Sequence, residues 1–184
     1  MIRVHGTAIN EKAVAAANTY DGLLQERESG ESAEELALIS AGLRETHDGG
    51  AFAAFASLQV AAAAVEAGDL VLARDELESV MATIELDSTL GQLVQLRLAR
   101  VMAASGDEAT AVAILEQGSS SFPASYAQAL GDIHLAAGRE SEALMAYQSA
   151  QTESLALGGQ LGLVDLKVSG LSLRDAEDSI EDSQ

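Results

Sequence analysis

The sequence predicts a nearly all-α protein. Its 184 residues include a single Pro and no Cys, and 48% of them are apolar although only 3% are aromatic. Ala, Leu, Glu and Gln, which are abundant here, favour helices, whereas Pro would interrupt them. Because the apolar side chains are mostly small, we expect helices that pack at short distances within one compact domain.

A pattern of small residues and glycines occurs three times in the middle of the chain. Gly68, Gly106 and Gly138 each have a small residue seven positions earlier, an Ala five positions later and a large residue nine positions later. The three sets are Ala61, Ala73 and Leu77; Ala99, Ala111 and Leu115; and Gly131, Ala143 and Tyr147. Antiparallel helices pack closely only where their crossing residues are small. The spacing therefore predicts tetratricopeptide-like (TPR-like) hairpins, with helix A before each Gly and helix B after it.

The expected helices follow from this register. Two helices, over 10–26 and 32–45, precede the repeats and are separated by a loop at 28–31. The three hairpins are expected over 51–67 and 69–84, 90–105 and 107–117, and 124–137 and 140–152. A glycine-rich hinge at 158–162 then leads to a last helix from about residue 160, which caps the open end of the solenoid.

Residues with short polar side chains mark several helix starts. Ser32 and Glu35 have the spacing of a capping box. The other expected N-caps are Asp69, Asp107 and either Asp87 or Ser88. Together these signals divide the chain into three parts: a flexible N-terminus or cloning remnant at 1–9, a TPR-like domain at 10–171, and a disordered acidic tail at 172–184.

The charge of the chain excludes several classes of partner. Ten Lys and Arg oppose 29 Asp and Glu, which gives a formal net charge of −19. Such a surface repels nucleic-acid phosphates and anionic lipids. The longest apolar stretch, 51–65, contains Ser57 and Gln59 and is shorter than a membrane span needs. The first residues also lack the apolar segment of a signal peptide.

The sequence contains no pattern typical of catalysis or metal binding. The three histidines are His5, His47 and His134, and none has a His or Cys three or four residues away. Carboxylate pairs such as Asp75 and Glu76 are expected to lie solvated at helix starts. The glycines of 158–162 follow no predicted strand and precede no Lys-Ser or Lys-Thr, unlike a phosphate-binding loop. We therefore expect no enzyme, no catalytic residue, no metal and no cofactor.

The A helices of a TPR-like stack line a concave groove, which is the expected partner-binding site. Its candidate residues are Phe55, Leu58, Ala62, Val65, Leu93, Leu96, Arg100, Gln128, Asp132 and Leu135. The apolar members fit the core equally well. Arg100 either pairs with a neighbour such as Asp132 or meets a carboxylate of a partner. One cation is too few for a clamp on a terminal carboxylate.

Four segments resemble a known family. They are Phe55–Ala61, Leu96–Val101, Leu130–Asp132 and Leu166–Val168, and the string LRLARV at 96–101 is the most specific. The resemblance, over about 13–171, is to the periplasmic domain of the YfgM-like ancillary subunits of the bacterial Sec translocon.

The resemblance implies a location and a set of partners. It implies a TPR-like domain on the periplasmic side of the inner membrane, tethered by an N-terminal helix that is absent from this chain. Expected partners are the translocon, a PpiD-like chaperone and translocating clients, and the family is also linked to envelope-stress signalling. The implied function is a non-catalytic protein-binding scaffold or co-chaperone. The alternative is a soluble regulatory TPR protein that binds a cytosolic peptide.

Overall fold

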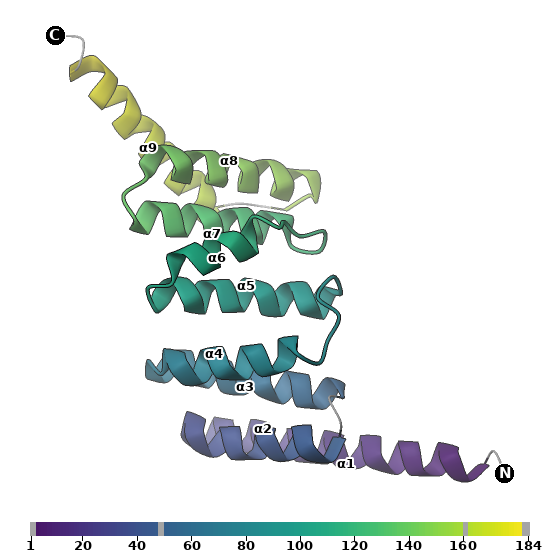
Figure 1. Ribbon diagram of the computed structural model, residues 1–184. Coiled ribbons are helices and arrows are strands. Elements are labelled where there is room, and N and C mark those ends of the chain that lie inside the picture. The colour runs from purple at the N-terminus through teal and green to yellow at the C-terminus, as the bar shows by residue number, and fades with distance from the viewer. Residues whose placement is uncertain (1–2, 48–49, 160–161, 182–184) are drawn as a thin grey trace. The chain divides into compact units, whose positions relative to one another are not determined.

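The computed structural model describes residues 3–47, 50–159 and 162–181, and in these ranges it contains nine α-helices and no strand (Figure 1). The expected all-α repeat fold is confirmed. The helices are α1 (Arg3–Ser29), α2 (Ala33–His47), α3 (Ala51–Ala67), α4 (Leu70–Met81), α5 (Thr89–Ala104), α6 (Glu108–Leu115), α7 (Pro123–Ala136), α8 (Glu140–Ala156) and α9 (Gly162–Glu181). The chain divides into two compact units, 1–94 and 95–184, and the division falls inside α5.

The glycines and small residues of the repeat pattern have the predicted roles. Gly68, Gly106 and Gly138 have φ angles of 82°, 91° and 75°, a left-handed conformation that favours glycine. They end α3, α5 and α7, the three A helices. The small and large residues of all three sets are buried. At Gly131 an added Cβ would lie 2.5 Å from Cε1 of Tyr147, so helix B contacts helix A directly there.

The predicted helix caps form hydrogen bonds. Asp69 and Asp107 accept from the backbone N–H three residues later, at 2.9 and 3.2 Å. Of the two candidates before α5, Ser88 is the cap, because its Oγ accepts from the N–H three residues later at 3.0 Å. In the capping box, the N–H of Glu35 donates to Ser32 Oγ and the N–H of Ser32 donates to Glu35 Oε2, both at 3.3 Å.

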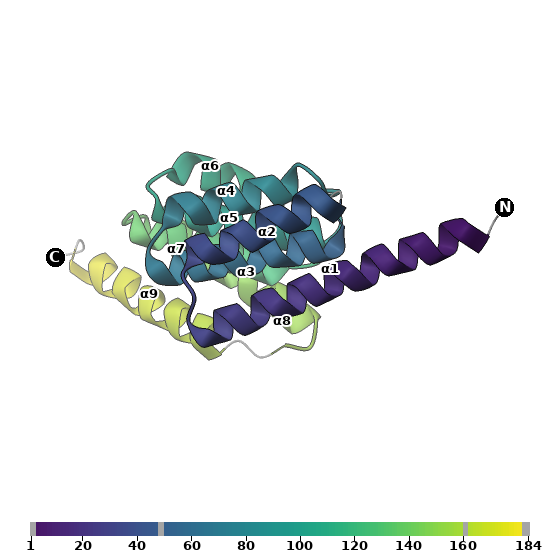
Figure 2. The same cartoon turned by 90° about the horizontal axis from the view of Figure 1, so that it is seen from below.

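The first unit contains α1 to α4 and the first residues of α5. Its core joins α1, α2 and α3 through the buried residues Ala16, Leu23, Leu36, Leu43, Ala53, Ala56 and Val60. A left-handed glycine, Gly30, separates α1 from α2, so these helices form a hairpin like those of the repeats. Only the C-terminal part of α1 packs against the unit, and its N-terminal part extends past α2 and α3 (Figure 2).

The second unit has two core clusters. The first contains Leu96, Ala99, Ala111, Leu115, Tyr126, Ala129 and Ile133, from α5, α6 and α7. The second contains Ala127, Ala143, Tyr147, Ala150, Val164 and Leu171, from α7, α8 and α9. Helix α9 thus covers α8 as the expected C-terminal cap, through Val164 and Leu171.

Both terminal helices are longer than expected. Helix α1 begins at Arg3, inside the segment 1–9 that we expected to be flexible. Helix α9 continues through Glu181, although we expected disorder over 172–184. No Pro or Gly lies between Leu171 and Glu181, so nothing stops a helix that packing has already started. Residues 1–2 and 182–184 lie outside the described residues. That the acidic tail contributes solubility rather than folding energy stays a prediction.

Substitution of Gly131 by Ala should lower the free energy of unfolding by about 1–3 kcal/mol, because the new methyl group would overlap the ring of Tyr147. The matched control is Gly170→Ala in α9, where an added Cβ meets no atom within 4 Å. That variant should gain up to about 1 kcal/mol from helix propensity and reduced chain entropy. Urea unfolding followed by circular dichroism measures both. Equal stability of the two variants would contradict the close crossing at Gly131.

Candidate functional site

Half of the candidate groove residues lie in the first unit. On α3, Phe55 and Val65 are 40% and 46% exposed, and Ala62 is half-buried. Leu93, at the start of α5, is also half-buried. Leu58 is only 5% exposed and belongs to the core. The first unit therefore presents two large apolar side chains of the candidate set, Phe55 and Val65, to solvent.

The other candidates lie in the second unit and are more involved in packing. Leu96 is 4% exposed and is a core residue, whereas Arg100 is exposed. On α7, Gln128, Asp132 and Leu135 are half-buried, and Leu135 packs against the cluster of α7, α8 and α9. None of the three offers a fully exposed side chain.

The assignment of Leu58 and Leu96 to a binding surface is wrong. Each lies three residues before the small residue at which its helix crosses helix B, Ala61 or Ala99. Residues three apart share one face of a helix. Both leucines therefore face the packed side of the hairpin.

Helix α1 places an aromatic side chain beside Phe55 and a cationic side chain beside Gln59 and Glu66. The ring centroid of Tyr20 lies 6.2 Å from that of Phe55 and 5.8 Å from that of Phe52. Arg27 donates to the side chain of Gln59 on α3 and pairs with Glu66 at 2.9 Å. Sequence analysis missed these α1 residues. For Tyr20 the available signal was Gly30, because the residue ten positions before this turn glycine is Tyr20, just as the residue ten positions before Gly68 is Leu58.

Asp132 binds within its own unit and not to Arg100. Its Oδ1 accepts a hydrogen bond from the Tyr147 hydroxyl at 2.7 Å and pairs with Lys167 of α9. Lys167 Nζ also lies 5.0 Å from the centroid of the Tyr147 ring, in cation–π contact. Among the described residues, no ion pair joins Arg100 to a carboxylate. Of the two alternatives for Arg100, the pairing with Asp132 is therefore wrong, and Arg100 remains available to a partner.

Tyr147 itself is fully buried. Burial raises the pKa of its hydroxyl well above the usual value, and the hydrogen bond to Asp132 and the charge of that carboxylate raise it further. Asp132 of α7, Tyr147 of α8 and Lys167 of α9 thus join these three helices through mutual contacts.

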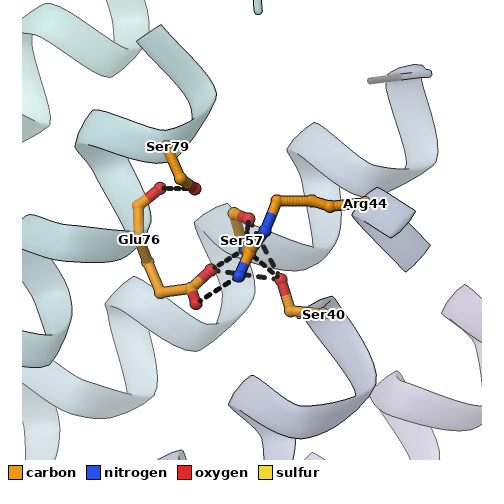
Figure 3. A network of polar contacts seen from close by, with 5 residues as sticks. All are labelled: Ser40, Arg44, Ser57, Glu76 and Ser79. Atoms are coloured by element: carbon orange, nitrogen blue, oxygen red, sulfur yellow. Dashed lines mark hydrogen bonds and ion pairs between the residues drawn. The ribbon is translucent and has the colours of Figure 1, made fainter. Parts of the chain in front are cut away.

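The most buried polar cluster joins α2, α3 and α4, and sequence analysis did not predict it. Arg44 Nη1 lies 2.6 Å from Glu76 Oε2, and Arg44 Nη2 lies 3.1 Å from Glu76 Oε1 (Figure 3). Ser40 Oγ donates to the same carboxylate at 3.1 Å, and Arg44 Nη1 lies 2.6 Å from Ser57 Oγ. Asp75 is exposed as expected, but the expectation of a solvated Glu76 is wrong, because its side chain is 5% exposed.

The geometry of this cluster is that of a structural ion pair. Two parallel bonds join the guanidinium and the carboxylate, Ser40 Oγ donates a further bond to the carboxylate, and Ser57 Oγ accepts one from the guanidinium. Among the described residues, no buried side-chain N or O atom lacks a hydrogen-bond partner. The available signals were Ser40 and Ser57, which interrupt apolar helix faces.

The histidines and carboxylates show no arrangement for metal binding in the described part of the chain. His134 is half-buried, and its Nδ1 accepts from Arg139 Nε at 3.0 Å. Arg139 also pairs with Glu108 of α6. His134 therefore belongs to a packed polar contact, whereas the side chains of His5 and His47 lie outside the described residues.

The geometry can be compared with known proteins. Left-handed glycines join paired helices that cross at small buried residues, and the family profile of the tetratricopeptide repeat-like domain matches residues 2–172. This chain belongs to that family. Tetratricopeptide-like domains are generally non-catalytic modules for protein interaction. Comparison with curated proteins and with solved structures gave no significant match. No helix within the described ranges combines the length and apolar character needed to cross a membrane.

Replacement of Arg44 by Ala should lower the free energy of unfolding by about 2–4 kcal/mol, because it leaves the buried carboxylate of Glu76 without its cation. The control is Arg74→Ala, which removes an exposed pair with Asp75 and should cost less than about 1 kcal/mol. Urea denaturation measures both. The double variant R44L/E76L should recover most of the loss. Similar small losses for R44A and R74A would contradict a buried ion pair.

The raised pKa of Tyr147 predicts a stability that depends on pH. The folded state holds the hydroxyl neutral, whereas the unfolded chain releases the proton near its usual pKa of about 10. The stability present below about pH 10 is therefore lost as the pH rises further, by up to about 1.4 kcal/mol per pH unit. Phe at position 147 should cost about 1 kcal/mol at pH 8 through the lost hydrogen bond.

Because Phe cannot ionise, only the wild type loses stability as the pH rises. The difference in free energy of unfolding between wild type and Tyr147→Phe, which we call the gap, should therefore narrow between pH 9 and 11. Urea unfolding at three pH values measures the gap. Tyr20→Phe is the control and should keep the pH dependence of the wild type, since Tyr147 remains. A constant gap for Tyr147→Phe would contradict the shifted ionisation.

Proposed function

We propose that this protein is a non-catalytic protein-binding scaffold or co-chaperone that holds its partners on the exposed faces of its A helices. The observation that carries the proposal is the exposure of Phe55 and Val65 on α3, a helix whose other positions are largely buried. Large apolar side chains that remain exposed beside a packed core are typical of protein-interaction sites. Membership of the tetratricopeptide repeat-like family supports the same function class.

The surface around Phe55 suits a protein partner rather than a small substrate. Tyr20 and Phe55 form an aromatic contact at one end of this face, and Arg27 with Glu66 adds an ion pair near Val65. The apolar side chains supply area that loses water on binding, and the polar pair supplies orientation.

We place this scaffold on the periplasmic side of the inner membrane, beside the translocon and a PpiD-like chaperone. The support for this location is the YfgM-like string at 96–101. Within it, Leu96, Leu98, Ala99 and Val101 are buried, so only Arg97 and Arg100 are accessible to a partner. The two arginines lie three residues apart on one face of α5, on a chain that is otherwise strongly acidic.

Photo-crosslinking tests the proposal with a matched pair of positions. A photoreactive residue at position 65, on helix A, should capture protein partners in intact cells. The same residue at position 71, on helix B of the same hairpin, is the control, because Val71 is also a valine and is 61% exposed. Capture at 65 but not at 71 is the expected result, and mass spectrometry identifies the partners.

The identity of the captured proteins separates the two locations. Translocon subunits, an envelope chaperone or translocating clients would support the periplasmic scaffold. Cytosolic proteins would favour the soluble regulatory alternative. Capture at position 71 alone would contradict the use of the A-helix face.

A further inference from the structure

Helix α9 exposes a regular line of leucines. Leu163, Leu166 and Leu173 are 63%, 70% and 67% exposed. With Gly170 they occupy positions i, i+3, i+7 and i+10, which fall on one face of a helix. We call these four residues the α9 stripe. An apolar line of three turns exceeds the isolated surface leucines that are normal in proteins.

The stripe is separate from the face by which α9 packs. Val164, Val168 and Leu171 contact the cluster of α7 and α8. The packing that caps the solenoid therefore uses these residues and leaves the stripe without a function in the fold. Replacement of the stripe leucines should thus leave the second unit folded.

The stripe lies next to the candidate face of α7. Lys167 pairs with Asp132, which is one of the candidate residues on α7. On the helix surface, Leu163 and Gly170 are the neighbours of Lys167 at four and three residues. This contact places one edge of the stripe beside Asp132 of α7, within the second unit.

The charges of α9 define the partner further. By sequence, α9 contains two cations, Lys167 and Arg174, and five carboxylates, of which Asp165 lies within the length of the stripe and the other four follow it at 175–181. Both cations are already paired, Lys167 with Asp132 and Arg174 with Glu140. A second copy of this chain, at a net charge of −19, would repel α9, whereas Lys and Arg would be attracted.

We propose that the α9 stripe binds an amphipathic α-helix of a protein partner, with apolar side chains at heptad spacing and basic residues on their flanks. The proposal rests on the proposed function and specifies its partner. A heptad line forms a continuous seam only with another helix, since an extended chain repeats every two residues. Gly170 gives this seam a notch, because an added Cβ would meet no atom within 4 Å and a large partner side chain can enter.

The test uses the whole chain and a fluorescein-labelled synthetic peptide of three heptads, with Leu at positions a and d and Lys at the flanking positions. Fluorescence anisotropy at 0.15 M salt measures the Kd. The triple variant L163S/L166S/L173S should weaken binding at least tenfold. The matched control M145S/L155S/L157S removes three equally exposed apolar side chains of α8 and its C-cap, and should stay within twofold of the wild type.

A second variant separates binding from folding. Gly170→Gln fills the notch in open space, so it should keep or raise the melting temperature while it weakens peptide binding several-fold. A peptide with Glu in place of Lys, and one with the same composition but scrambled leucines, should bind at least tenfold more weakly than the Lys peptide.

Several outcomes would overturn the proposal. They are equal losses in the two triple variants, unchanged binding of the stripe variant, and equal binding of the scrambled peptide. A wild-type dimer in sedimentation that the stripe variant abolishes would assign the stripe to a second copy instead. In each case, crosslinking at Val65 reports on the proposed function independently, because that position lies in the first unit.

Discussion

The fold depends on the close contact of helix A with helix B at small residues. At Gly131 the contact leaves no room for even one methyl group beside the ring of Tyr147. At the other two hairpins, the crossing residues Ala61 and Ala99 are buried, and so are the large residues Leu77 and Leu115. This geometry explains how a chain with few aromatic residues forms a packed core in each unit. Small crossing residues bring the backbones together, so modest side chains suffice to fill the interior.

In the first unit, a buried polar cluster joins helices that otherwise pack through apolar side chains. Arg44 and Glu76, with Ser40 and Ser57, join three helices through bonds that require one relative position. Apolar packing of alanine surfaces tolerates sliding, whereas a bidentate ion pair does not. Desolvating the pair costs free energy that the bonds largely return, so its contribution is to the uniqueness of the arrangement more than to net stability.

Local and periodic features of this protein could be predicted from the sequence. The turn glycines, the caps Asp69 and Asp107 and the buried residues around each crossing all follow from spacings within one hairpin. The failures concern contacts between hairpins. The repeat register predicts that Leu58 and Leu96 lie on A helices, but it does not predict how deeply neighbouring helices bury them. Both are core residues. Asp132 forms an ion pair with Lys167, 35 positions away, and Glu76 forms one with Arg44, 32 positions away. The leucines of α9 can be read from the sequence. Only the structure shows which apolar residues of α9 pack against α7 and α8 and which form the exposed stripe.

The left-handed glycine turns also affect the speed of folding. Each turn reverses the chain within a few residues, so helix A meets helix B as soon as both have formed. Contacts that are near in sequence require little loop-closure entropy, and proteins that are rich in them fold in microseconds to milliseconds. A hairpin such as α3 with α4 could therefore form while later residues are still being synthesised. In a helical-repeat chain of this kind, the N-terminal hairpins can fold before the C-terminal residues have been synthesised.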